Sequence, residues 1–198
     1  MCSSQKYKVD SVFSLYNDTR SVFKLNDIAM LTGETNFVSL NKKLNYSVHS
    51  GKLLNLRKGI YSKLNYDLEE LACRIFLPSY ISLEYVLQKS GIIFQYSSEI
   101  TSVSYLSRSV TINDKDFTFR KIKNSILMNT SGIVQNMNAV NIATPERAFL
   151  DMLYLNTNYT FDNVHVLNKE LIFKLLPIYN SKKLTDRTIK TLNYNGLK

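Results

Sequence analysis

Residues 23–48 read FKLNDIAMLTGETNFVSLNKKLNYSV, and this stretch carries strong local structural signals. Apolar residues at helical spacing predict a helix over residues 23–31, with Asn26 as its N-cap. Gly33 then predicts a sharp turn, because glycine ends helices by adopting a positive φ. A second helix is predicted over residues 36–48, so the stretch reads helix, turn, helix.

The helix predicted over residues 36–48 is amphipathic. Its apolar residues recur at spacings of three and four and are expected to pack on a core. They are Phe37, Leu40, Leu44 and Val48. The opposite side is polar and basic, with Asn36, Ser39, Lys42, Lys43 and Tyr46.

A β-hairpin is predicted next, from two short apolar runs at residues 52–56 and 60–62. Its tip is basic and consists of Arg57, Lys58 and Gly59. An earlier helix is predicted over residues 8–15. Three short helices followed by a basic hairpin is the layout of a winged helix-turn-helix, so we expect such a domain over residues 1–66.

Positive charge is concentrated in the same part of the chain. The protein has 198 residues and a formal net charge of +9. Residues 1–66 contain ten Lys and Arg against four Asp and Glu, a net +6, and the remainder contains fifteen against twelve, a net +3. This asymmetry favours a polyanionic partner for the first third. We therefore expect residues 1–66 to bind double-stranded DNA.

The DNA contacts are expected on the polar side of the 36–48 helix and at the hairpin tip. A helix in the major groove presents side chains to base edges, while Lys and Arg neutralise phosphates. The predicted contacts are Thr35, Asn36, Ser39, Lys42, Lys43, Tyr46, Arg57, Lys58 and Gly59. The alternatives are a helix with a merely solvated basic face and a winged helix that binds a protein.

Residues 67–198 are expected to form a second domain in which helices and strands mix. A helix is predicted over residues 67–76, followed by a short helix over residues 83–89 with Ser82 as its N-cap. The fold class is therefore α+β: an N-terminal winged helix-turn-helix domain and a C-terminal mixed α/β domain.

Alternating apolar residues predict strands between residues 99 and 142, with a turn at residues 113–116. Thr144 and Pro145 are the expected N-cap and first residue of a strong helix. Two further helices are predicted over residues 168–176 and 185–194.

Composition excludes several classes of function. The N-terminus has no apolar core of a signal peptide, and no apolar run is long enough to span a membrane. A disulfide between Cys2 and Cys73 is not expected, so a cytoplasmic protein is the better expectation. Neither His49 nor His165 has metal-ligand neighbours at a suitable spacing, and we expect no metal or cofactor.

Catalytic residues are not expected either. Asp114 and Asp116 lie in a predicted turn, where they would be solvated. Arg147 and Asp151 share one helix at a spacing of four, which fits an ion pair. The glycines are scattered singly and form no phosphate-binding loop. We therefore expect a protein that is not an enzyme.

Several short segments resemble the AbiEi family of antitoxins. They are, in chain order, residues 23–29, 36–48, 51–61, 78–84, 100–104 and 142–151. The last contains TPERAFLD, which resembles the family's Thr-Pro-Glu-Lys/Arg-Ala helix. The resemblance covers most of residues 20–155. It rests on the order and spacing of these segments, because each one is short.

The resemblance implies the antitoxin half of a type IV toxin–antitoxin pair, some of which act in abortive phage infection. The N-terminal domain would bind inverted repeats in its own promoter and repress it, with Lys42, Lys43, Arg57 and Lys58 as its basic contacts. The C-terminal domain would counteract a nucleotidyltransferase toxin, with direct contact left open. The sequence is compatible with a monomer in solution that binds DNA as a cooperative pair.

Basic residues of the second domain suggest a surface for an anionic partner in antitoxin activity. They are Arg108, Arg120, Lys121, Lys123 and Arg147. The main alternative function is an effector-responsive winged-helix regulator without a toxin partner. A nuclease, which would gather carboxylates near Asp114, Asp116 or Asp151, and a protein-binding adaptor are the other two.

Overall fold

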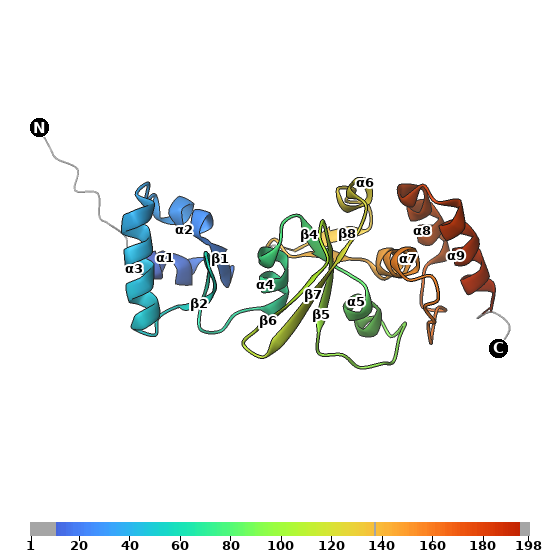
Figure 1. Ribbon diagram of the computed structural model, residues 1–198, viewed down its shortest axis with the longest axis horizontal. Coiled ribbons are helices and arrows are strands. Elements are labelled where there is room, and N and C mark those ends of the chain that lie inside the picture. The colour runs from blue at the N-terminus through green and yellow to red at the C-terminus, as the bar shows by residue number, and fades with distance from the viewer. Residues whose placement is uncertain (1–10, 137, 195–198) are drawn as a thin grey trace, which may run out of the picture. The chain divides into compact units, whose positions relative to one another are not determined.

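The computed structural model describes residues 11–136 and 138–194. The chain divides into two compact units, Met1–Ile75 and Phe76–Lys198, here called unit 1 and unit 2 (Figure 1). Unit 1 contains a three-stranded sheet and unit 2 a six-stranded sheet, and helices accompany both. The expected mixed α+β class is therefore confirmed.

Unit 1 combines short helices with an antiparallel sheet. Its elements are α1 (Ser11–Asn17), β1 (Val22–Lys24), α2 (Leu25–Thr32), α3 (Phe37–His49), β2 (Leu54–Arg57), β3 (Ile60–Ser62) and α4 (Leu68–Ile75). The strand order is β1-β3-β2, with both neighbouring pairs antiparallel. The part of the predicted 8–15 helix that precedes residue 11 lies outside the described residues.

The start of α2 differs from the prediction. The predicted helix begins at residue 23, but Phe23 pairs with Tyr61 in the sheet, so the chain is extended there. Lys24, and not Asn26, occupies the N-cap position. The Asp27 carboxylate accepts a hydrogen bond from the Lys24 backbone N–H at 2.9 Å, which satisfies a free donor at the helix start.

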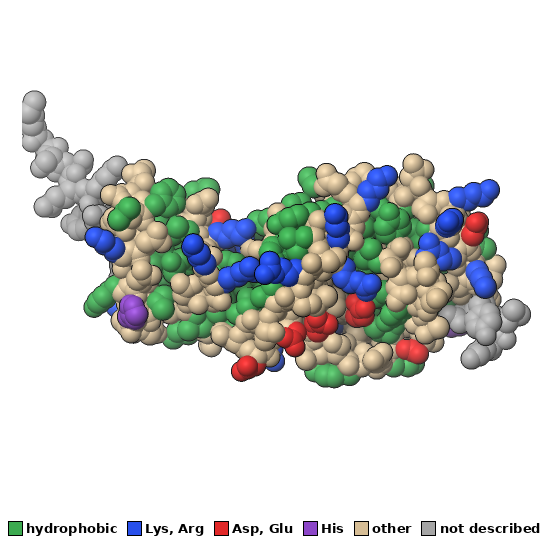
Figure 2. Space-filling view, viewed as in Figure 1, with side chains coloured by type: hydrophobic (Ala, Val, Ile, Leu, Met, Phe, Trp, Pro, Cys, Tyr) green, Lys and Arg blue, Asp and Glu red, His purple; other side chains and the backbone are tan. Residues whose placement is uncertain are grey.

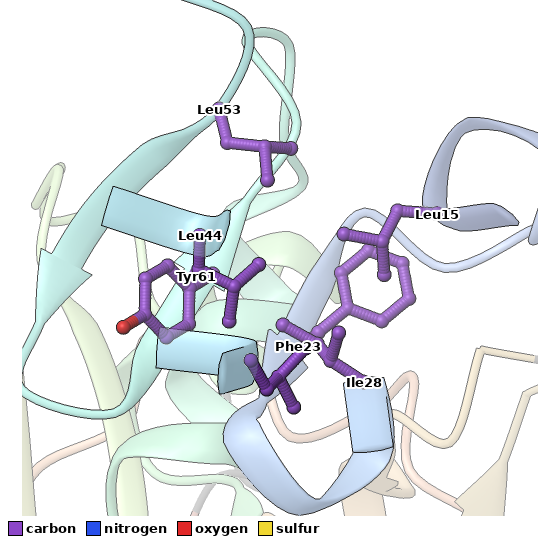
Figure 3. Packing of buried hydrophobic residues seen from close by; sticks show 7 residues of the cluster. Leu15, Phe23, Ile28, Leu44, Leu53 and Tyr61 are labelled. Atoms are coloured by element: carbon purple, nitrogen blue, oxygen red, sulfur yellow. The ribbon is translucent and has the colours of Figure 1, made fainter. Parts of the chain in front are cut away.

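Apolar side chains from α1, α2, α3, the sheet and the segment just before β2 form the core of unit 1 (Figure 3). This cluster comprises Leu15, Phe23, Ile28, Leu40, Leu44, Leu53 and Tyr61. Burial of each large apolar side chain stabilises the fold by about 1.5–3 kcal/mol. Of the predicted apolar face of α3, Leu40 and Leu44 lie in this core and Val48 packs against it, as predicted. Phe37 does not, because it is 46% exposed at the first residue of the helix.

Helix α4 belongs to unit 1 because its buried Glu70 binds the start of β1. One Glu70 carboxylate oxygen accepts hydrogen bonds from the Ser21 backbone N–H at 2.6 Å, the Ser21 hydroxyl at 2.8 Å and the Val22 N–H at 3.0 Å. The two units therefore divide after Ile75, later than the boundary predicted after residue 66.

Unit 2 is built on a mixed six-stranded sheet with helices packed against it. Its elements are β4 (Ser79–Ile81), α5 (Glu84–Lys89), β5 (Ile100–Ser104), β6 (Arg108–Ile112), β7 (Lys115–Lys121), α6 (Asn124–Leu127), β8 (Ile133–Gln135), β9 (Asn141–Ala143), α7 (Pro145–Leu155), α8 (Lys169–Leu175), the 3-10 helix η1 (Leu176–Tyr179) and α9 (Lys182–Tyr194).

The sheet of unit 2 has the strand order β6-β7-β5-β4-β9-β8. The pairs β5–β7 and β4–β9 are parallel, and the other neighbours are antiparallel. Helix α7 contacts α5 and also packs against α8 and α9. Helix α7 is therefore central in unit 2, because it contacts one helix that precedes it in the chain and two that follow it.

Two local predictions in unit 2 are confirmed and one is wrong. Asn113 and Asp114 form the predicted turn between β6 and β7, with φ angles of 48° and 58°. Thr144 is the N-cap of α7, and its hydroxyl accepts a hydrogen bond from the Arg147 backbone N–H at 3.3 Å. Ser82 does not cap α5, because Leu83 occupies the N-cap position.

Candidate nucleic-acid interface

Helix α3 begins where the Asn36 side chain caps it. The Asn36 amide oxygen accepts hydrogen bonds from the Val38 and Ser39 backbone N–H groups, each at 3.0 Å. These bonds satisfy two donors that a helix start leaves free. Asn36 was predicted as a DNA contact, but its amide oxygen is engaged in the protein itself.

The outward face of α3 carries residues that recur at spacings of four, three and four. With about 3.6 residues per turn, such residues lie along one line on a helix. This row consists of Val38, Lys42, Asn45 and His49, all exposed. Tyr46, beside the row, is 71% exposed. Lys42 and Tyr46 were predicted there, whereas Val38, Asn45 and His49 were missed, although the helical period opposite the core residues identifies them.

Two predicted contacts lie at the edge of this face. Ser39 is half-buried. Lys43 is half-buried as well, and its ammonium group forms an ion pair of 2.5 Å with the Glu34 carboxylate. The turn before α3 therefore neutralises the charge of Lys43, which makes it a weaker candidate for a phosphate contact than Lys42.

The predicted basic tip of the hairpin forms a tight turn at Lys58 and Gly59. Lys58 is exposed, while Arg57 is half-buried within β2. Gly59 has a φ of 77°, and its carbonyl oxygen accepts a hydrogen bond of 3.1 Å from the Leu25 N–H. This bond joins the turn to the start of α2. Thr35 is exposed just before α3, as a DNA contact requires.

Acidic residues are absent from the sequence that forms this surface. Residues 35–66 contain no Asp or Glu, and their basic residues are Lys42, Lys43, Lys52, Arg57, Lys58 and Lys63. Elsewhere in unit 1, Asp18 binds Arg20 at 2.8 Å, and this hydrogen bond lowers the pKa of the Asp18 carboxyl. Exposed Lys and Arg side chains are visible over unit 1 in Figure 2. Apart from Glu34, which pairs with Lys43, the sequence of this surface contributes no carboxylate that would oppose the attraction of an anion.

The basic residues predicted as a surface in unit 2 do not form one surface in the structure. Arg147 is fully buried and lies in the core, which corrects its placement on a surface. Its guanidinium donates hydrogen bonds of 2.9 Å to the carbonyl oxygens of Ser131 and Ile126. A third bond, of 3.2 Å, goes to the Tyr80 hydroxyl. Arg147 thus joins segments of unit 2 and is not accessible to a partner.

Asp151 completes this buried network. It lies 3.5 Å from the Arg147 guanidinium, so the predicted ion pair exists, but in the core. Its carboxylate accepts hydrogen bonds from Tyr179 at 2.6 Å, Ser82 at 2.8 Å and Tyr80 at 3.0 Å. Burial raises the pKa values of Tyr80 and Tyr179, so both phenols stay protonated as donors. Burial also raises the pKa of the Asp151 carboxyl, against the opposing effect of Arg147.

The remaining basic residues predicted as a surface in unit 2 differ in their exposure. Arg120 is half-buried and lies 3.5 Å from the Glu84 carboxylate. Arg108, Lys121 and Lys123 are exposed, at the start of β6 and at and just after the end of β7. The predicted surface is therefore reduced to these three side chains.

Metal-binding groups do not gather in the parts of the chain that are described. Within residues 11–136 and 138–194, no three His, Cys, Asp or Glu side chains could hold a metal ion together. Asp151 is buried, whereas Asp114 is exposed in the β6–β7 turn. Asp116 is exposed as well, but it lies in β7 and not in the predicted turn, and its carboxylate accepts a hydrogen bond of 2.7 Å from the Thr111 hydroxyl. Cys73 is buried with a free thiol, and Cys2 lies outside the described residues.

No helix in the described part of the chain is long and apolar enough to cross a membrane. The fold is similar to that of the RV2827C protein from Mycobacterium tuberculosis, known from a crystal structure, with a TM-score of 0.56 and 11% identity. The similarity covers 93% of this chain and 75% of that one. At such low identity it concerns the fold alone. No family model and no curated protein matches the chain.

Proposed function

We propose that this protein binds double-stranded DNA through unit 1 and represses its own promoter as the antitoxin of a type IV toxin–antitoxin pair. Unit 1 would act as a winged helix-turn-helix, with α2 and α3 as its helix pair and β2 and β3 as its wing. The element order helix, strand, helix, helix, hairpin supports this assignment. The partner would be a nucleotidyltransferase toxin.

The observation that carries DNA binding is the exposed face of α3 within an acid-free stretch. Lys42 on this face and Lys58 in the hairpin turn are both exposed. Residues 35–66 supply no carboxylate to repel a phosphate. Lysines that neutralise phosphates release condensed counterions, which drives binding to duplex DNA of any sequence. Polar side chains on the same face would then distinguish sequences.

DNA binding is tested by replacing Lys42 and Lys58 with Ala in the full chain. Affinity for a duplex of the protein's own promoter should fall, because two phosphate contacts are lost. The slope of log affinity against log salt should become shallower by about two, since each contact contributes about 0.9. Fluorescence anisotropy over a salt series measures both quantities.

The matched control replaces Lys182 and Lys183, two exposed lysines of α9, by Ala. It removes the same charge from the chain but leaves unit 1 intact. If both double variants lower the salt slope equally, DNA binding depends only on the net charge of the protein, and α3 is not the DNA-binding surface. If the wild-type chain shows no salt-dependent affinity for DNA, the proposal is wrong.

The antitoxin role is supported by the sequence resemblance, and the exposed basic residues of unit 2 are its candidate surface. Replacement of Arg108, Lys121 and Lys123 by Glu should abolish rescue of cells that express the proposed nucleotidyltransferase toxin. Growth of cells with both proteins induced measures rescue. Promoter binding by the same variant is the control and should be unchanged, since unit 1 is untouched. Full rescue would exclude this surface.

A further inference from the structure

The row on the outer face of α3 contains one apolar residue, Val38. Its side chain is 67% exposed, and Phe37 beside it is 46% exposed. Large apolar side chains that stay in water forgo the free energy of burial, so the two neighbouring residues Phe37 and Val38 are candidates for a contact with a partner. The start of α3 therefore offers an apolar contact on a surface that is otherwise polar and basic.

Asn45 lies in the same row, and its side chain takes part in neither of the two interactions that involve nearby polar residues of this helix. The amide of Asn36 caps the helix, and the ammonium of Lys43 binds Glu34. Asn45 is exposed, and neither the cap nor that ion pair includes it. An exposed amide on a helix can donate and accept at once, which is the pattern needed for a bidentate contact.

The major groove of DNA limits what these two side chains can recognise. The C5 methyl group of thymine is the apolar group that a base pair exposes there. Adenine presents the N7 acceptor and the N6 donor side by side, and the amide of Asn fits both. Val38 and Asn45 are seven residues apart, which is about 10 Å along a helix. They would therefore contact different base pairs.

We propose that Val38 and Asn45 select A·T base pairs in the operator. Val38 contacts a thymine methyl group, and Asn45 forms two hydrogen bonds with an adenine. Lys42 between them binds the backbone and adds affinity without sequence preference. This inference rests on the proposed function of unit 1 and names the bases that its α3 face recognises.

The test uses base analogues in a duplex of the promoter segment that the protein protects in footprinting. Deoxyuridine in place of thymine removes only the methyl group. At one position it should weaken wild-type binding about fourfold, the effect expected for one lost apolar carbon. At another position, 7-deazaadenine in place of adenine should weaken binding about tenfold, because it removes the N7 acceptor.

The variants Val38→Ala and Asn45→Ala assign each effect to its side chain. Val38→Ala should bind the thymine and deoxyuridine duplexes equally, and Asn45→Ala should bind the adenine and 7-deazaadenine duplexes equally. A variant that merely folds poorly would lose affinity for all duplexes in parallel and would keep the wild-type ratios. Asn41→Ala, at a half-buried position beside the row, is the control and should also keep those ratios.

The possible results separate this inference from the proposed function. Salt-dependent binding that Lys42→Ala weakens, together with no sensitivity to either analogue, would overturn the A·T assignment and leave DNA binding by unit 1 standing. Analogue effects that persist in Val38→Ala and Asn45→Ala would assign recognition to other residues and overturn the inference as well. Absence of any salt-dependent binding would overturn both proposals.

Discussion

Helices α3 and α7 begin alike and then occupy opposite environments. The side chain of Asn36 caps α3, and that of Thr144 caps α7. Helix α3 buries Leu40, Leu44 and Ser47 and exposes a polar face, whereas α7 buries every residue from 146 to 153. Basic residues occur in both. The same residue type thus serves a candidate binding surface in one helix and the core in the other.

The difference shows that a basic residue in a helix indicates a partner only when water surrounds it. Lys42 is exposed, so its charge is available to a phosphate. Arg147 has no exposed surface, and Asp151 together with two carbonyl oxygens and a phenol satisfies most of its donors. A buried charge without such partners would be strongly destabilising. Stability should therefore depend on α7, and DNA affinity on α3.

The largest expected effect comes from Asp151→Asn in α7. The substitution keeps the shape of the side chain but leaves the Arg147 charge uncompensated in the core. Unfolding of unit 2 should become easier by about 3–5 kcal/mol, the cost of breaking a buried ion pair. Guanidinium-induced unfolding followed by circular dichroism measures it.

Asp186→Asn in α9 is the control for this prediction. Asp186 is exposed, so its replacement should change the free energy of unfolding by less than about 0.5 kcal/mol. Equal stability of the two variants would show that the network around Arg147 does not hold unit 2 together.

A smaller effect is expected from Gly132→Ala, next to the same network. A β-carbon at Gly132 would lie 3.0 Å from a Leu175 methyl carbon and 3.1 Å from the Arg147 β-carbon. Forced shifts of that kind cost about 1–3 kcal/mol. Gly91→Ala is the matched comparison, because Gly91 also has a positive φ but no atom within 4 Å of the added carbon.

The difference between the two glycine variants isolates packing from backbone strain. Both should lose stability through strain at positive φ, and Gly132→Ala should lose more. Thermal unfolding of both proteins gives the comparison. If the two melting temperatures fall equally, the side chains around Gly132 move aside without a loss of stability. The packing of α7 would then be less rigid than its burial indicates.

The smallest effect is expected from Asn36→Ala at the start of α3. Loss of the cap should destabilise unit 1 by about 1 kcal/mol. Asn36→Ser restores a capping oxygen and should recover the stability. Its DNA affinity then decides the role of Asn36: wild-type affinity indicates a cap alone, while a loss of affinity at wild-type stability would restore Asn36 as a DNA contact.

Long or strongly patterned elements could be predicted from the sequence. The helix over residues 36–48, the hairpin with its Lys58-Gly59 turn and the Thr144-Pro145 helix start all carry local signals that the structure shows in place. The alternation that predicted strands after residue 99 corresponds to β5, β6 and β7. The outer face of α3 was predicted in part, since the predicted residues Lys42 and Tyr46 lie on it, as does Val38, which was not among the predicted contacts.

Features that depend on distant contacts could not be predicted. Strands β1, β4, β8 and β9 have three residues each, too few to show a period, and exist through their sheet partners. The spacing of Arg147 and Asp151 fits an ion pair in water or in a core equally well. Lys43 was expected to be free because its partner, Glu34, lies in the turn and not on the same helix.

Glu70 in α4 has a consequence for how this protein can be divided or recombined. Its carboxylate holds the backbone at Ser21 and Val22, where the sheet of unit 1 begins. A gene fusion that joins the first 66 residues to a different second half would separate these donors from their acceptor. The exchangeable module therefore extends to Ile75, and chimaeras that keep α4 with unit 1 should retain its fold.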